Sequence, residues 1–245
     1  MIKKIALYTA FSIFKKKGWM LAVFFILFNI MSYFYINSLT DFFIPQIFVS
    51  ANLTFFLALS ILFSIMWSYS EIGAEIKDKK NYIILGKGVS RSVYLYGKYS
   101  GILFSLIINS IFVYAIIFAE TLFFNDVFSG FFSSFIVHVS RIAMFTALFA
   151  GINTIFSLIN SFGLSVLGFG LSQIVYVSGN EFKSIFIEII KLLLPCEYYF
   201  AEVERAFLSS INIPFNYLLF VVIYSILYIF IILNIFSFFF SRKEL

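Results

Sequence analysis

The side chains with the most capacity for chemistry gather in one segment of this otherwise apolar chain, from Glu71 to Gly101. Its acidic and basic residues are Glu71, Glu75, Asp78, Lys77, Lys79, Lys80, Lys87, Arg91 and Lys98. Long hydrophobic runs flank the segment on both sides, so we expect it to stand in water between two membrane spans. We interpret it as the place where a partner protein acts on the chain.

Residue patterns that are typical of catalysis or of nucleotide binding do not accompany this segment. The chain has no Gly-x-x-x-x-Gly-Lys-Ser/Thr loop, so we do not expect it to bind ATP in the P-loop manner. His138 is the only histidine and Cys196 the only cysteine, whereas a zinc site needs about three or four ligands. We therefore expect neither an enzyme nor a cofactor here. We interpret His138 as a histidine near a span boundary, and an intramembrane enzyme that uses it is a separate hypothesis.

The composition of the chain predicts a membrane protein. Hydrophobic residues make up 62% of the 245 positions and charged residues only 12%, whereas soluble domains carry about 25% charged residues. The net charge is +5, but the basic residues lie next to apolar runs, so we expect a bilayer and no nucleic acid as the partner of this charge. The 37 phenylalanines either fill lipid-facing positions or line a path for an apolar cargo.

Six apolar runs have the length and composition that are typical of membrane spans. They cover residues 19–39, 47–69, 99–118, 135–159, 162–178 and 215–240. The predicted fold class is therefore an all-α integral membrane protein, with six transmembrane helices in a single domain of residues 1–245. We interpret Arg141, near the outer end of the fourth run, as an arginine that extends its side chain to the membrane surface.

Two further segments have the pattern of amphipathic helices. Residues 1–18 place several lysines on one helical face and apolar residues on the other, which predicts an interfacial helix at an anionic membrane surface. Residues 179–214 mix charged and apolar residues and are divided by Pro195, which predicts external amphipathic helices between spans five and six.

The distribution of basic residues predicts the orientation of the chain. Thirteen of the 17 Lys and Arg residues lie in the N-terminal segment, in residues 71–98 or after the last span, and the first two external links have none. By the positive-inside rule we expect a multi-pass protein of the cell (plasma) membrane with both termini in the cytoplasm.

The charged segment of residues 71–98 contains a predicted cytoplasmic helix. Between Glu75 and Leu85, apolar and polar residues fall on different faces of a helix, and Gly86 and Gly88 are typical of a helix end. A short rigid helix attached to two spans acts as a lever, so a partner that displaces it moves spans two and three together.

The residues after this helix carry a family resemblance. Val89, Ser90 and Arg91 form a turn-like motif, five mainly apolar residues follow, and Gly97 and Lys98 close the pattern. This run resembles the segment after the coupling helix of type II ABC exporter permeases, with Glu75 at the acidic position. Gly88 replaces the usual proline, and Lys79 and Lys80 stand where Gly-Thr is often found.

The resemblance implies partners and site residues. The partners are two copies of a cytoplasmic ABC ATP-binding subunit, which hold ATP and Mg, and a second permease copy or a paralogous permease. The implied ATPase-coupling residues are Glu71, Glu75, Asp78, Lys80, Val89, Ser90 and Arg91. Spans two and five line the cargo path in the family, which implies Asn52, Phe55, Phe56, Ser60, Ser165, Phe169 and Gln173. Asn29, in the first span, either bonds a neighbouring helix or faces this path.

The expected function is the permease subunit of an ATP-driven exporter in a bacterial membrane. Its expected cargo is apolar or amphipathic, such as a membrane-active peptide, a lipid or a drug. The alternative is a non-transport immunity or sensor protein that sequesters a toxic peptide, and protection without any ATPase partner would distinguish it.

Overall fold

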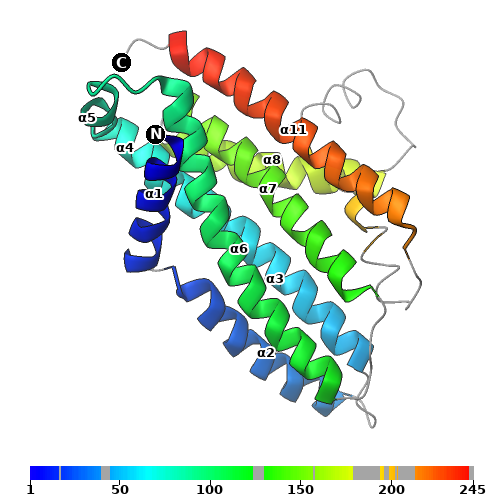
Figure 1. Cartoon of the computed structure of the whole chain (residues 1–245). Coiled ribbons are helices and arrows are strands. Elements are labelled where there is room, and N and C mark those ends of the chain that lie inside the picture. The colour runs from blue at the N-terminus through cyan, green and yellow to red at the C-terminus, as the bar shows by residue number, and fades with distance from the viewer. Residues whose placement is uncertain are drawn as a thin grey trace.

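The computed structural model describes residues 1–16, 18–39, 45–123, 130–156, 158–178, 194–195, 199–201, 203 and 213–242. These residues form helices and turns without a strand. The elements are α1 (Ile2–Lys16), α2 (Met20–Leu39), α3 (Pro45–Ser68), η1 (Tyr69–Gly73), α4 (Ala74–Lys77), α5 (Asn81–Leu85), α6 (Arg91–Phe123), α7 (Phe131–Ile155), α8 (Leu158–Ser178) and α11 (Phe215–Arg242). Figure 1 shows the long helices side by side, with α1, α4 and α5 at the end of the bundle that holds both termini.

Five helical stretches of the described chain are long and apolar enough to cross a membrane. They are Met20–Ser38, Ile47–Lys77, Arg91–Phe123, Phe131–Ile155 and Phe215–Arg242. The protein is thus an all-helical, membrane-embedded chain, as its composition predicts. The predicted fifth span, residues 162–178, falls within α8, which is not among these five, so the six-span count stays a prediction. The predicted external helices lie almost wholly outside the described residues.

The core of the bundle is built around α7. This helix packs against α3, α6, α8 and α11, and every residue from Arg141 to Thr154 is buried. A helix that is apolar on all sides is stable only when other helices cover it. The prediction that this span reaches residue 159 is wrong, because Phe156 adopts an extended backbone and α7 ends at Ile155.

The N-terminal helix α1 lies directly against α6. A Cβ atom added to Gly97 would stand 2.7 Å from the side chain of Ile5, and one added to Gly101 would stand 2.6 Å from the carbonyl oxygen of Ala6. Glycine is therefore needed at both positions for the two helices to approach this closely. The predicted helix at residues 1–18 is present, and its position at a membrane surface stays a prediction.

The prediction of one continuous helix from Glu75 to Leu85 is wrong. The chain continues from α3 through η1 into α4, turns at residues 78–80, and resumes as α5. Lys79 has a φ of 57°, in the left-handed region that side chains other than glycine rarely adopt, and this residue interrupts the helix. The predicted helix end is confirmed, because α5 ends at Leu85 and Gly88 has a φ of 78°.

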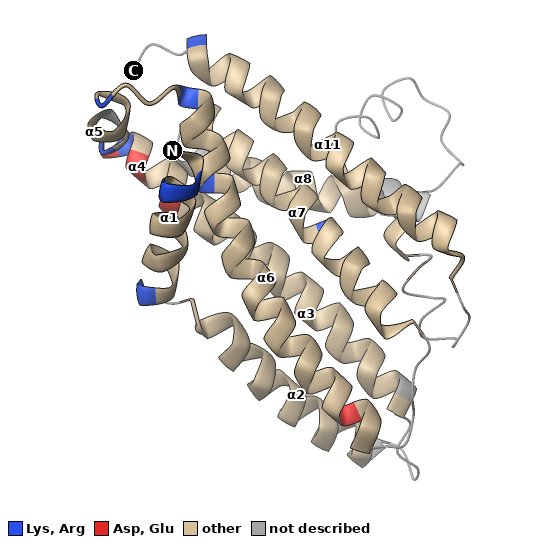
Figure 2. Cartoon of the chain, in the orientation of Figure 1, with Lys and Arg blue, Asp and Glu red and all other residues tan. Residues whose placement is uncertain are grey.

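Charged residues are unevenly distributed along the bundle. Figure 2 shows most of the described basic positions at the end that holds α4, α5 and both termini. The middle of the bundle is almost entirely uncharged in the same view, and an acidic position stands near the far end of α6. This arrangement is the one that the positive-inside rule associates with a cytoplasmic end, and the orientation itself stays a prediction.

Candidate functional site

The charged segment begins inside the protein rather than in water. The helix α3 enters it through the single π turn η1, and Glu71 in this turn is only 1% exposed. Single π turns inside helices are frequent at functional sites. The same turn lies close to α7, because a Cβ atom on Gly73 would stand 2.8 Å from the amide oxygen of Asn153. The expectation that the whole segment stands in water is therefore corrected at its first turn.

Lys98 of α6 lies at the centre of a buried group of charges. Its ammonium nitrogen is 2.6 Å from Glu75 Oε1 and 3.5 Å from Glu71 Oε2. The Lys98 side chain has no exposed surface. An ammonium group so far from water requires opposite charges around it, and the two carboxylates supply them.

Three more side chains complete the hydrogen bonds of these carboxylates. Ser12 Oγ and Lys16 Nζ of α1 each donate to Glu71 Oε1 over 3.1 Å. Tyr94 Oη of α6 donates to Glu75 Oε2 over 2.9 Å. We call these six residues the ion network; they are Ser12, Lys16, Glu71, Glu75, Tyr94 and Lys98.

The ion network is electrically balanced and joins three parts of the fold. Two lysines neutralise two glutamates, and the partners come from α1, from the η1–α4 stretch and from α6. Buried ion pairs tolerate desolvation only when their geometry is good, and removal of one partner costs about 3–5 kcal/mol. The network is therefore a joint, by which we mean a set of contacts that holds the η1–α4 stretch against α1 and α6.

Arg91 forms a second joint, between the start of α6 and the end of α11. One of its terminal nitrogens donates to the carbonyl oxygens of Phe240 and Ser241 over 2.7 Å and 3.0 Å. The last carbonyls of a helix have no partner within the helix, and a guanidinium group satisfies them well. Val89 is buried just before α6, and Ser90 Oγ accepts a hydrogen bond from the backbone N–H of Val93 as a helix cap does.

Four consecutive exposed residues, 77–80, begin at the last residue of α4, and we call them the tip. Asp78 and Lys80 form a pair over 2.8 Å, with both side chains largely in solvent. The hydrogen bond from Lys80 lowers the pKa of Asp78, and the same contact raises the pKa of Lys80. Of the seven predicted coupling residues, Asp78, Lys80 and Ser90 are exposed and so are open to a soluble partner.

Several predicted cargo-path residues of α3 pack against α2. Asn52, Phe56 and Ser60 follow one another at a spacing of four, so they share one face of the helix, and all three are buried in the bundle. Asn52 accepts a hydrogen bond from Ser32 Oγ over 3.1 Å. Phe55, three residues after Asn52, is half-buried and stacks on Phe28 of α2, with ring centroids 3.5 Å apart.

The predicted cargo-path residues of α8 have local partners. Ser165 Oγ donates to the carbonyl oxygen of Ser161 over 2.8 Å, and Phe169 packs edge-on against Phe145 at 5.5 Å. Gln173 is half-buried, and its side-chain nitrogen has no hydrogen-bond acceptor among the described residues. Neither of the two cavities described below is lined by any of the seven cargo-path residues of α3 and α8.

His138 and Arg141 are more buried than the sequence predicts. His138 is 2% exposed and stacks on Phe56, with ring centroids 4.7 Å apart and an angle of 17° between the rings. Arg141 is 5% exposed. Both side chains lie on the covered faces of α7, so Arg141 does not extend out of the bundle as predicted. The position of His138 relative to a span boundary stays a prediction.

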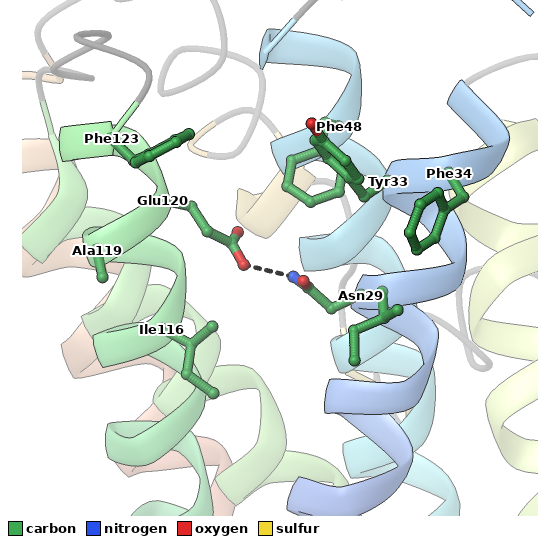
Figure 3. Close-up of a pocket in the computed structure, with 9 residues that line it drawn as sticks. Asn29, Tyr33, Phe34, Phe48, Ile116, Ala119, Glu120 and Phe123 are labelled. Carbon is green, nitrogen blue, oxygen red and sulfur yellow. Dashed lines mark hydrogen bonds between the residues drawn. The ribbon is translucent and has the colours of Figure 1, made fainter. Parts of the chain in front are cut away.

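Asn29 bonds a neighbouring helix. Its side-chain nitrogen donates to Glu120 Oε1 over 2.5 Å, from α2 to α6, as Figure 3 shows. Asn29 and Glu120 also line a cavity between these two helices. The predicted bond to a neighbouring helix is present, and the alternative that Asn29 faces the cargo path stays a prediction.

Sequence reasoning missed several residues of these sites, namely Ser12, Lys16, Tyr94, Lys98 and Glu120. A signal existed for Lys98, because Glu71 and Glu75 are four residues apart and a helix places them on one face. Such a pair of carboxylates beside an apolar helix calls for a cation on that helix. No such signal existed for Lys16, whose contact with Glu71 joins residues 55 positions apart.

No protein-family model and no curated protein matches this chain. The resemblance to type II ABC exporter permeases thus rests on the residues from Glu75 to Lys98 and on the order of the helices.

Proposed function

We propose that this chain is the permease subunit of an ATP-driven exporter of the plasma membrane, with an apolar or amphipathic cargo such as a lipid, a drug or a membrane-active peptide. Its partners are two cytoplasmic ABC ATP-binding subunits and a second permease. The observation that carries the proposal is the ion network, which holds the η1–α4 stretch directly before the exposed tip against α1 and α6.

The geometry suits the transfer of a displacement from the tip to the bundle. The tip follows α4, and α4 continues through η1 into α3 without a break in the helix. Lys98 holds the same stretch against α6 through Glu71 and Glu75. A partner that moves the tip therefore moves α3 and α6 together, and α7 packs against both. This is the coupling of one rigid element to another that hinge and shear transitions require.

The division of labour separates contact from transmission. Asp78 and Lys80 are exposed, so they serve the first encounter with the ATP-binding subunit, where charges at the rim of an interface affect association most. Glu75 and Lys98 lie inward, so they serve transmission. ATP is hydrolysed in the partner subunit, and this chain supplies the membrane path.

The test is purification of the tagged chain from its native membranes, identification of any ATP-binding subunit that co-purifies, and ATP hydrolysis by the recovered complex in proteoliposomes. We expect the double variant Asp78→Lys/Lys80→Glu to reduce the recovered complex several-fold. Glu75→Gln should abolish the stimulation of hydrolysis by cargo in the complex that is recovered. Lys4→Gln, an exposed charge change on α1, is the control for both readouts.

The proposal is wrong if no ATP-binding subunit co-purifies with the wild-type chain, or if Glu75→Gln leaves stimulation intact. Protection of cells from a toxic peptide without such a subunit would instead support the non-transport alternative.

A further inference from the structure

The helix α2 lies at the edge of the bundle, and two cavities lie along it. Of the five membrane-crossing stretches, α2 has the smallest buried share. The first cavity, of about 510 Å³, is bounded by α2, α3 and α6. We call it the Glu120 cavity, and its lining is Asn29, Ile30, Tyr33, Phe34, Phe48, Ile116, Ala119, Glu120 and Phe123. Figure 3 shows the side chain of Glu120 reaching from α6 across this space toward Asn29.

One oxygen of Glu120 has no hydrogen-bond partner in the part of the chain that the structure describes. Oε1 accepts the hydrogen bond from Asn29, whereas Oε2 is buried and has no hydrogen-bond partner among the described residues. No described Lys or Arg nitrogen lies within 4.0 Å of this carboxylate. An acidic group in an apolar, membrane-embedded setting without a counter-charge is costly, and such groups mark functional sites.

The unpartnered oxygen of Glu120 determines what a ligand at this place has to supply. A ligand that brings both a positive charge and N–H donors to Oε2 would satisfy it in full, because charge-assisted hydrogen bonds are the strongest of their kind.

The rest of the cavity suits the same ligand. Tyr33, Phe34, Phe48 and Phe123 place aromatic rings around the carboxylate, and the faces of such rings attract cations. Phe34 is 67% exposed and Phe123 is 79% exposed, so the cavity opens sideways, out of the bundle. The aliphatic side chains of Ile30 and Ile116 offer contact to an alkyl chain.

We propose that the Glu120 cavity binds a cationic amphiphile, with its ammonium group at Glu120 Oε2 among the aromatic rings and its alkyl chain along α2 and α6. This inference goes beyond the proposed function, because it needs neither an ATP-binding subunit nor transport. The second cavity, of about 790 Å³, also lies along α2 and includes Lys16 and Glu71. Those two charges already neutralise each other, so that cavity has no unmet charge to offer.

The test is equilibrium dialysis of radiolabelled dodecylammonium against the full-length chain in micelles of a neutral detergent. We expect saturable binding to the wild type. The variant Glu120→Gln should bind at least about tenfold more weakly, since the loss of one partner of a desolvated charge pair has effects of that size. Dodecanol, which has the same alkyl chain without the charge, should show no saturable binding.

A second variant keeps the result interpretable if Glu120→Gln alters the fold. Phe34→Ala removes an exposed ring from the mouth of the cavity and should weaken binding several-fold. Phe112→Ala is its control, because Phe112 is an exposed phenylalanine of α6 outside the cavity, and it should bind as the wild type does. Equal binding by the wild type and both cavity variants, or equal binding of dodecanol, would overturn the proposal. These results are independent of whether an ATP-binding subunit co-purifies.

Discussion

Glu71 and Glu120 are carboxylates of the same kind in the same bundle, and their surroundings differ sharply. Glu71 accepts hydrogen bonds from Ser12, Lys16 and Lys98, two of which are cations. Glu120 accepts one hydrogen bond, from the neutral amide of Asn29. At one end of the bundle the chain thus supplies the counter-charges itself, and at the other end the described chain supplies none.

From this difference we infer two roles: Glu71 holds helices together, and Glu120 binds a ligand, so that we call the first a joint and the second a receptor. A carboxylate whose partners all come from the chain holds helices together, and its removal should weaken the fold. A carboxylate that the fold leaves incompletely bonded contributes little to stability, and its role lies in what it binds. Substitutions at the two ends should therefore affect different measurements.

The largest expected effect is at Lys98, whose replacement leaves two carboxylates without their buried cation. We expect Lys98→Met to reduce the free energy of unfolding by about 3–5 kcal/mol, measured by thermal unfolding in neutral detergent. The triple variant with Glu71→Gln and Glu75→Gln should recover part of this loss, because it removes the uncompensated charges as well. A wild-type unfolding temperature for Lys98→Met would show that the ion network is not a joint.

The next effect is a direct contrast between the two glutamates under the same change. Glu71→Gln removes the charge to which Lys16 and Lys98 bond, and we expect a loss of about 1.5–3 kcal/mol. Glu120→Gln removes a charge without a described cation, so we expect a change within about 1 kcal/mol in either direction. Unfolding in parallel under one set of conditions measures both, and equal losses would remove the distinction between joint and receptor.

The close approach of α1 to α6, beside the ion network, can be tested at a glycine of α6. Gly101→Ala places a methyl group against the backbone of α1, and we expect a loss of about 1–3 kcal/mol from overpacking. The control is Gly163→Ala in α8, where nothing lies within 4 Å of the added atom. That variant should gain about 0.5–1 kcal/mol, because alanine favours a helix over glycine. Equal unfolding temperatures for the two variants would contradict the packing of α1 on α6.

The smallest effect concerns the exposed tip. The pKa of Asp78 is lowered by Lys80, so the contribution of this pair to stability is present above the unfolded pKa and is lost as the pH falls through the folded pKa. Exposed pairs contribute little, so Asp78→Asn should leave the unfolding temperature unchanged between pH 5 and pH 8. A clear loss in that range would place Asp78 among the buried charges rather than at an open contact surface.

The sequence predicted the class of the fold and much of its layout, because long apolar runs have few alternatives to membrane helices. It did not predict the break at Lys79, because a left-handed backbone is usually indicated by a glycine and this position holds a lysine. It also did not predict the π turn that contains Glu71. Both features depend on contacts with other helices. A helix that is apolar on every face has no periodicity that shows which side other helices cover, and so the burial of His138 and Arg141 in α7 was not predicted.

The partners in the candidate site were predictable only in part, for a related reason. The acidic pair Glu71 and Glu75 follows from spacing along one helix. The bond between Asn29 and Glu120 joins residues 91 positions apart, and the contact of Lys16 with Glu71 joins residues 55 positions apart. Such pairs depend on which helices are neighbours, and composition and hydropathy carry no information about that choice.

The most direct test of the coupling role is a cross-link from the tip in native membranes. With Cys196 replaced by serine, Lys80→Cys gives the chain a single thiol at the tip. Ser38→Cys gives a matched exposed thiol at the C-terminal end of α2, at the other end of the bundle from α4 and α5. We predict that the thiol at position 80 cross-links to a cytoplasmic ATP-binding subunit, with a yield that changes when ATP is added, and that the thiol at position 38 does not. Absence of that product from position 80, or an equal yield from both positions, would contradict the account.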